Sequence, residues 1–317
     1  MRILSDADVS MGTQPSVVAL GTFDGVHRGH QELLAIVVAH ARQRGALATV
    51  ITFDPHPASV VAPERAPQQI ASLVQRLEWF AVLGIDQVRL ITFDEAAAQE
   101  SASAFTQRVV VDEIHAISVV TGDDTHFGKD RQGNADFLES FGQTAGFSVV
   151  RCPSFGGEVR FSTSLVRAAL AGGDLDEVTN VLGRPFVLRG EVVHGDHRGR
   201  ELGYPTANLS LAAHQALPAL GIYAGAAFVQ GEWRCAAISV GRRPQFYDNG
   251  FVLVEVYLPG FTGDIYGEVL DVAFLSRLRP EMTFDDLDGL LVQMGLDVER
   301  AKEIFETFTP SSPFLLR

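Results

Sequence analysis

One stretch of the chain, residues 21–30 with the sequence GTFDGVHRGH, combines residue types that can hold a phosphate group. It follows an apolar run at residues 17–20, which predicts a buried parallel strand, and it precedes an amphipathic segment at residues 31–44, which predicts a helix. A strand, a glycine-containing loop and a helix N-terminus form an anion site, because free backbone N–H groups and the positive end of the helix dipole point toward the ligand. His27 and His30 add side-chain donors. The stretch therefore predicts a site for a nucleoside triphosphate.

The loop differs from two common phosphate-binding motifs. No Gly-Lys-Ser/Thr follows it, as in the Walker pattern, and it lacks the Gly-x-Gly-x-x-Gly fingerprint of dinucleotide-binding folds. The pattern His-x-Gly-His, formed by His27, Gly29 and His30, resembles the signature of the nucleotidyltransferase superfamily. That resemblance implies transfer of a nucleoside monophosphate from a triphosphate to an acceptor. The alternative interpretation is a glycine-rich turn that only connects a strand to a helix.

A second candidate for phosphate binding is the start of another predicted helix at residues 162–167. Ser162, Thr163 and Ser164 are residue types that often serve only as helix N-caps. If Ser164 caps this helix, Arg167 lies one turn into it, and its guanidinium can pair with phosphate oxygens through two parallel hydrogen bonds. The hypothesis is that Arg167 and the histidine loop grip a triphosphate from two sides.

Composition limits the possible partners. A formal net charge of −14 disfavours a surface for nucleic acid, which needs Lys and Arg to neutralise phosphates, but it still permits a local nucleotide site. The two cysteines, Cys152 and Cys235, are too few for a disulfide framework or a zinc cluster. Residues 1–10 lack the pattern of a signal peptide, and no apolar run approaches the roughly 18 residues of a membrane span. We therefore expect a cytoplasmic protein with no membrane partner, and the oligomeric state stays open.

The first half of the chain alternates predicted strands and helices. Further strands are expected at residues 48–53, 87–93, 117–121 and 147–150, with helices at residues 70–83 and 102–110 between them. This alternation is typical of an α/β Rossmann-like nucleotidyltransferase domain, in which helices cover both faces of a parallel sheet. Ligands of such folds bind at the carboxyl ends of the strands, where residues 21–24, 53–57 and 122–124 are expected.

The pattern changes near residue 186. Short alternating segments at residues 188–193, 223–229, 234–240 and 252–258, separated by turn residues, predict a small antiparallel β-barrel closed by a helix at residues 284–305. Gly183 and Pro185 end the helix that begins near Asp174. We therefore expect two domains, at residues 1–183 and 186–317.

The order of the motifs resembles one enzyme family over nearly the whole chain. GTFDGVHRGH, then TFDPHP at residues 52–57, GDDTHFG at 122–128 and the helix start at 162–167 are similar to the FAD synthetase module of bacterial bifunctional riboflavin kinase/FMN adenylyltransferases. RGEVVHG at 189–195 and GRELGYPTANL at 199–209 resemble the riboflavin kinase motif of the same family. Residues 221–225 and 254–257 follow in the expected order.

For the first domain, the resemblance implies that the FMN phosphate attacks the α-phosphorus of ATP and expels pyrophosphate. His27, His30 and Arg167 would be catalytic. The implied nucleotide-binding residues are Gly21, Thr22, Phe23, Asp24, Gly25, Gly29, Ser162, Thr163 and Ser164, and the implied flavin-binding residues are Asp54, Pro55, Asp124 and Phe127. Asp123 and Asp124 could equally cap a turn after a strand.

For the second domain, the resemblance implies that the 5′-hydroxyl of riboflavin attacks the γ-phosphorus of ATP. Glu255 would be the general base, while Thr206 and Asn208 would bind Mg²⁺, because hydroxyl and carbonyl oxygens are suitable ligands for that ion. Gly195, Gly203 and Pro205 are the implied nucleotide-binding residues here. Without the resemblance, Glu255 reads as part of a solvated strand face, and the Pro-Thr-Ala-Asn run as a loop that enters a strand.

Two segments depart from the family pattern. Arg243 and Gln245 stand where the family usually has Asn-Pro-Thr-Phe, which puts the kinase activity in question, and Thr125 stands where an aromatic residue is common. The leading hypothesis is a bifunctional enzyme that turns riboflavin into FMN and then FAD with ATP and Mg²⁺. The alternatives are an FMN adenylyltransferase with an inactive or redirected kinase-like domain, and a flavin or nucleotide sensor without turnover.

Overall fold

The described residues of the chain form two compact units. The computed structural model describes residues 1–7, 14–153, 155–157, 159–195, 199, 202–242, 252–310, 312 and 314–315. Of these, residues up to 68 and from 73 to 162 make the first unit, and residues 69–72 and those from 163 onward make the second. The predicted boundary at residues 183–186 would leave the helices Thr163–Gly172 and Leu175–Leu182 in the first domain, whereas both belong to the second compact unit. The predicted domain boundary stays a prediction. Within the described part of the chain, no helix is long and apolar enough to cross a bilayer.

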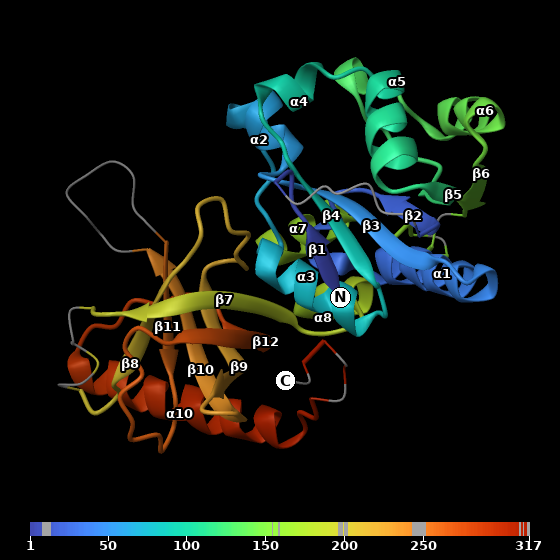
Figure 1. The fold of residues 1–317 in the computed structure, drawn as a ribbon. Helices are drawn as coiled ribbons and strands as arrows, with labels where there is room; N and C mark the ends of the chain where they lie inside the picture. Colours follow the sequence, from blue (N-terminus) through green and yellow to red (C-terminus); the bar gives the residue numbers. More distant parts are fainter. Residues whose placement is uncertain are drawn as a thin grey trace. The chain divides into compact units, whose positions relative to one another are not determined.

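A single parallel sheet organises the first unit (Figure 1). Its strands are β1 (Arg2–Leu4), β2 (Ser16–Leu20), β3 (Leu47–Asp54), β4 (Gln87–Thr92), β5 (Ala116–Gly122) and β6 (Ser148–Cys152). They lie in the order β1-β4-β3-β2-β5-β6, and every pair is parallel. From β2, the strands β3 and β4 are added in turn on one side, whereas β5 and then β6 are added on the other side of β2. The direction therefore reverses between β2 and β5, and such a switch point opens a crevice at the carboxyl ends of the strands.

Helices cover both faces of this sheet, as predicted. Helix α1 (Arg28–Arg44) buries Leu34, Val37 and Ala41 and packs on β2, β3 and β5. On the other face, α5 (Ala102–Phe105), the π-helical η3 (Thr106–Glu113) and α6 (Ala135–Ala145) share a core with alternate residues of β2, β3 and β5. The remaining elements are η1 (Asp24–Val26), α2 (Pro57–Val61), η2 (Pro63–Arg65), α3 (Leu73–Val82), α4 (Glu95–Gln99) and η4 (Lys129–Arg131). Because both faces are covered, β2 is buried along its whole length.

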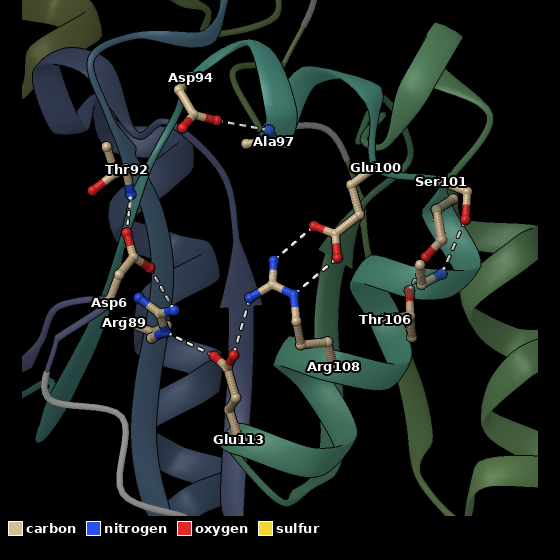
Figure 2. A network of polar contacts seen from close by, with 12 residues as sticks. Asp6, Arg89, Thr92, Asp94, Ala97, Glu100, Ser101, Thr106, Arg108 and Glu113 are labelled. Carbon is tan, nitrogen blue, oxygen red and sulfur yellow. Dashed lines mark hydrogen bonds and ion pairs between the residues drawn. The ribbon is translucent and has the colours of Figure 1, made fainter.

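A network of ion pairs joins β4 to the segment after β1 and to η3 (Figure 2). The buried side chain of Arg89 donates to Glu113 at 2.8 Å and to Asp6 at 2.7 Å, and Arg108 donates to the other oxygen of Glu113 and to Glu100. Burial opposes ionisation of Asp6, but hydrogen bonds from Thr92 and Arg89 outweigh it, so the pKa of that carboxyl is lowered. The buried guanidinium is therefore fully paired, as a buried charge must be.

The second unit is a closed antiparallel barrel with helices against it. The barrel strands are β7 (Phe186–Val193), β8 (Thr206–Ser210), β9 (Gly221–Val229), β10 (Glu232–Arg242), β11 (Val252–Tyr257) and β12 (Val269–Arg279), in the order β10-β11-β8-β7-β12-β9. The chain enters through α7 (Thr163–Gly172) and α8 (Leu175–Leu182), and α8 ends at Gly183 as predicted. Helix α10 (Leu287–Glu306) packs on β9, β10 and β12. The predicted barrel and its C-terminal helix are thus confirmed.

Candidate functional sites

The histidine loop follows β2 and ends at the N-terminus of α1. His27 is the N-cap of α1, and its Nδ1 accepts a hydrogen bond from the backbone N–H of His30 at 3.3 Å. The two imidazole rings are stacked, with their centroids 3.6 Å apart. Gln31 donates from Nε2 to the carbonyl of Val26 at 2.9 Å. The loop therefore brings His27 and His30 together at a helix N-terminus, which is the geometry of an anion site.

The backbone of this loop is strained. Phe23, Gly25 and Val26 have φ angles of 49°, 70° and 39°, in the left-handed region that non-glycine residues rarely adopt. The ring of Phe23 packs edge-on against His30, at 5.1 Å between centroids, and against Phe80 at 5.7 Å. Strained backbone persists only where its surroundings hold it, and it is concentrated at ligand-binding and catalytic segments.

The surroundings of His30 keep its imidazole neutral. Burial lowers the pKa of His30 well below its ordinary value, and the nearby charges of His27 and Arg160 lower it further. Its Nδ1 is shielded from solvent and has no hydrogen-bond partner among the described residues. An orphaned ring nitrogen beside a helix N-terminus is suited to contact a bound phosphate.

The loop after β5 holds Asp124, on the other side of the switch point. Asp124 forms an ion pair with Arg160 at 2.6 Å, and Arg28 at the start of α1 lies over the ring of Phe161, 5.1 Å from its centroid. Residues 160 and 161 thus contact both the loop after β5 and the N-terminus of α1. Arg160 lies outside every sequence motif, so its contact with Asp124 could not be predicted from the sequence. Phe127 lies in the core against Phe105 and other aromatic rings, so its contact with a flavin stays a prediction.

Asp54 and Pro55, two predicted flavin-binding residues at the end of β3, are joined by a cis peptide bond, and Asp54 is the last residue of the strand. The Arg76 guanidinium from α3 lies 4.0 Å from the Asp54 carboxylate and donates to the carbonyl of Thr22 at 2.7 Å. Asp54 and Thr22 thus lie beside one buried cation. Arg76 was not predicted as a site residue, although a cation within the mostly apolar run of α3 is a visible signal.

The helix start at residues 162–167, the second candidate for phosphate binding, is not capped by Ser164 as supposed. Helix α7 begins at Thr163, so Ser164 lies inside the helix and cannot cap it. Arg167 lies in α7, in the second compact unit, whereas Ser162 and His27 belong to the first. The joint grip of Arg167 and the histidine loop on a triphosphate stays a prediction.

The barrel contains a cavity of about 410 Å³, lined by strands β8, β10 and β11 and by α10. Asn208, Glu255 and Ser239 lie directly opposite one another on three neighbouring strands, and Thr206 is two residues from Asn208 on the same face. The Thr206 hydroxyl donates to a carboxylate oxygen of Glu255 at 3.4 Å. Strand pairing therefore places the hydroxyl, amide and carboxylate predicted for the kinase around one cavity.

Helix α10 lines the same cavity through residues that include Leu290, Met294 and Asp297. Asp297 accepts hydrogen bonds from the Arg279 guanidinium, the shortest at 2.7 Å, and another from Gln293. Both members of this ion pair are nearly buried, at 14% and 9% side-chain exposure. Asp297 was not predicted as a site residue, although an acidic residue on the buried side of an amphipathic helix is a usable signal.

Two predicted glycines shape the approach to this cavity. A Cβ on Gly195 would lie 2.2 Å from Nδ2 of Asn208, so only glycine permits this close packing. Gly203 has a φ of 83°, and Pro205, two residues later, lines the cavity. Arg243 and Gln245, the departures from the family pattern, lie outside the described residues.

The donor set at the cavity fits a hard cation with few protein ligands. Among the described residues, no group of three or more histidine, cysteine or acidic side chains could hold a metal. The hydroxyl of Thr206 and the amide oxygen of Asn208 are hard oxygen donors, and Mg²⁺ usually takes only one or two protein ligands beside substrate phosphates and water.

Comparisons with known proteins match both units. Residues 10–164 match a family model described as FAD synthetase, and residues 182–305 match one described as riboflavin kinase. A curated bifunctional riboflavin kinase/FMN adenylyltransferase from Pseudomonas fluorescens is 36% identical over 91% of this chain and 92% of its own length. The protein of the same description from Escherichia coli (strain K12) is 35% identical over 93% and 94%. A crystal structure described as a macrolide-efflux protein from Streptococcus pneumoniae has a TM-score of 0.85 at 31% identity, over 98% of this chain and 100% of that one.

Proposed function

The chain belongs to the family of bifunctional riboflavin kinase/FMN adenylyltransferases, and we propose that it converts riboflavin to FMN and FMN to FAD. The observation that carries the proposal is the cavity in the barrel, where Thr206, Asn208 and Glu255 lie together. The histidine loop of the first unit supplies the second site.

In adenylyl transfer, a phosphate oxygen of FMN bonds to the α-phosphorus of ATP as the bond to the β-phosphate breaks, and pyrophosphate leaves with the released charge. Such a reaction requires mainly positioning and charge stabilisation from the protein. His27 and His30 lie at a helix N-terminus, and a neutral His30 can donate a hydrogen bond to a phosphate oxygen. Arg167 is proposed to bind the departing pyrophosphate.

In riboflavin phosphorylation, the 5′-hydroxyl of riboflavin bonds to the γ-phosphorus of ATP, and ADP leaves. Glu255 is proposed to accept the hydroxyl proton, which makes a poor nucleophile competent. Its hydrogen bond from Thr206 holds one carboxylate oxygen in place, so the other is available. Thr206 and Asn208 would hold Mg²⁺, which supplies charge neutralisation for the phosphates when it is bound.

Product analysis tests both halves of the proposal. The wild type is incubated with riboflavin, ATP and Mg²⁺, and the flavins are separated by chromatography. We expect FMN and FAD from the wild type, FMN alone from His30→Ala, and FAD from Glu255→Gln only when FMN is supplied. Glu232→Gln, at an exposed glutamate of β10 outside the motifs, is the matched control and should retain both activities.

The alternatives predict other products. FAD formed by the wild type from FMN but not from riboflavin would favour a monofunctional adenylyltransferase with an inactive or redirected barrel, as the departures at Arg243 and Gln245 allow. Ligand binding by calorimetry without release of pyrophosphate or ADP would favour a sensor.

A further inference from the structure

Arg76 is a buried cation at the carboxyl end of the parallel sheet. Only 4% of its surface is exposed, and its Nη1 lies 2.7 Å from the carbonyl oxygen of Thr22 and 3.3 Å from the hydroxyl of Thr52. Thr22 follows β2, whereas Thr52 lies near the end of the neighbouring strand β3. One side chain on α3 therefore contacts two adjacent strand ends at the edge where ligands of such folds bind.

The contact to Thr22 lies at the start of the strained histidine loop. Phe23, the next residue, has the first left-handed φ angle, and Val26 has the last. The carbonyl of Val26 accepts a hydrogen bond from Gln31 at 2.9 Å. The strained segment is thus held at both ends by side-chain donors, Arg76 before it and Gln31 after it, and loss of either donor should let the loop relax.

The charge of Arg76 is matched by carboxylates on the two loops. Asp54 lies 4.0 Å away, and the charges of Asp24 and Asp54 oppose the lowering of the Arg76 pKa by burial. Asp24 belongs to the histidine loop, and Asp54 is the last residue of β3, at the start of the predicted flavin-binding segment. The guanidinium therefore lies between a predicted nucleotide-binding loop and a predicted flavin-binding segment.

We infer that Arg76 is a positioning residue for adenylyl transfer, which sets the separation between the loop that binds ATP and the segment that binds FMN. This inference rests on the proposed function of the first unit. Arginine suits the role because its planar group offers several donors in a fixed geometry, whereas lysine is a single point charge. Arg76→Lys should keep the charge but lose the simultaneous contacts.

The test compares Arg76→Met and Arg76→Lys with the wild type in steady-state adenylylation of FMN, with riboflavin phosphorylation as an internal reference. A hydrogen bond from a charged group is lost, so we expect kcat/KM for FMN to fall about 10- to 100-fold in Arg76→Met. Arg76→Lys should lie between Arg76→Met and the wild type. Riboflavin phosphorylation should change less than about twofold.

The matched control is Arg89→Met, which removes another buried arginine of the same unit whose contacts in Figure 2 involve no predicted site residue. It should lower the unfolding temperature but leave KM for FMN and ATP unchanged in the folded protein. The inference is overturned if Arg76→Met keeps the wild-type kinetic constants, or if Arg89→Met shifts KM as much. If Arg76→Met does not fold, Arg76→Lys decides between these results.

A failure of the proposed function can be told apart. If the wild type forms no FAD from supplied FMN, adenylylation by this chain is refuted. Calorimetry with ATP and with FMN then decides the inference alone, because weaker binding of both by the folded Arg76 variants supports it and unchanged binding overturns it.

Discussion

At the scale of single residues, the surroundings of His30 matter as much as its type. Burial, and after it the stacked His27 and the nearby Arg160, lower the pKa of His30, so the folded protein favours the neutral imidazole. In the unfolded chain the same imidazole has an ordinary pKa near 6.5. Because the unfolded state binds more protons below that pKa, folding stability falls as the pH falls through this range.

We therefore predict that the first unit loses stability between about pH 7.5 and pH 5.5, by at most about 1.4 kcal/mol per pH unit from His30. His30→Asn should reduce this dependence. Urea denaturation followed by the fluorescence of Trp79, in a Trp233→Phe background, measures it for this unit. An equal pH dependence in both proteins would contradict the assignment to His30.

Gly195 packs against Asn208 so closely that there is no room for a side chain at position 195. We predict that Gly195→Ala lowers riboflavin phosphorylation about 10- to 100-fold, because a Cβ would displace Asn208 from the cavity wall. Adenylylation of supplied FMN should not change. Gly172→Ala is the matched control, since a Cβ there meets nothing within 4 Å. Full kinase activity in Gly195→Ala would show that the position of Asn208 is not critical.

At the scale of elements, one ion pair between strand β12 and helix α10 fixes a wall of the barrel cavity. Arg279 and Asp297 form it, and both side chains are nearly buried. Removing one partner of a buried pair leaves an uncompensated charge, which costs far more than breaking an exposed pair.

We predict that Asp297→Ala destabilises the second unit by about 3–5 kcal/mol and raises the kinase KM for riboflavin or ATP. Glu303→Ala breaks the exposed pair with Arg300 on the same helix and should cost less than about 1 kcal/mol. Denaturation followed by the fluorescence of Trp233, in a Trp79→Phe background, compares the two variants. Equal losses in both would mean that burial of the first pair contributes little.

At the scale of the whole molecule, each unit has its own core, and His27 and His30 lie in a different unit from Glu255. The aromatic and aliphatic core of the first unit lies against the parallel sheet, and a separate cluster with Val187, Ala226 and Ala273 lies in the second. The two proposed reactions should therefore be separable, with FMN as the shared intermediate.

We predict that a mixture of His30→Ala and Glu255→Gln forms FAD from riboflavin, although neither variant does so alone. The first variant makes FMN, which diffuses to the intact adenylyl-transfer site of the second. Chromatography of the mixture and of each variant measures this. If each variant keeps its own reaction but the mixture forms no FAD, FMN is not released between the two steps.

Much of the fold followed from apolar patterns. Strands β2 to β6 and helix α10 were predicted within a few residues, because buried runs and helical periodicity are local properties. Strand β1 has three residues, too few to show a pattern. Strand β12 was missed because its register shifts between Phe274 and Ser276 and again between Arg277 and Arg279, which breaks the alternation.

The sequence by itself determined the two fold types and their order, a parallel α/β sheet followed by an antiparallel barrel, because apolar periodicity and the motifs around His27, Thr206 and Glu255 are local features of the chain. Only the tertiary structure decided which distant residues support them. Arg76 reaches Thr22 across 54 positions of the chain, and Asp297 meets Arg279 only because α10 packs on the barrel. Such contacts depend on strand pairing and helix packing, which no local pattern specifies.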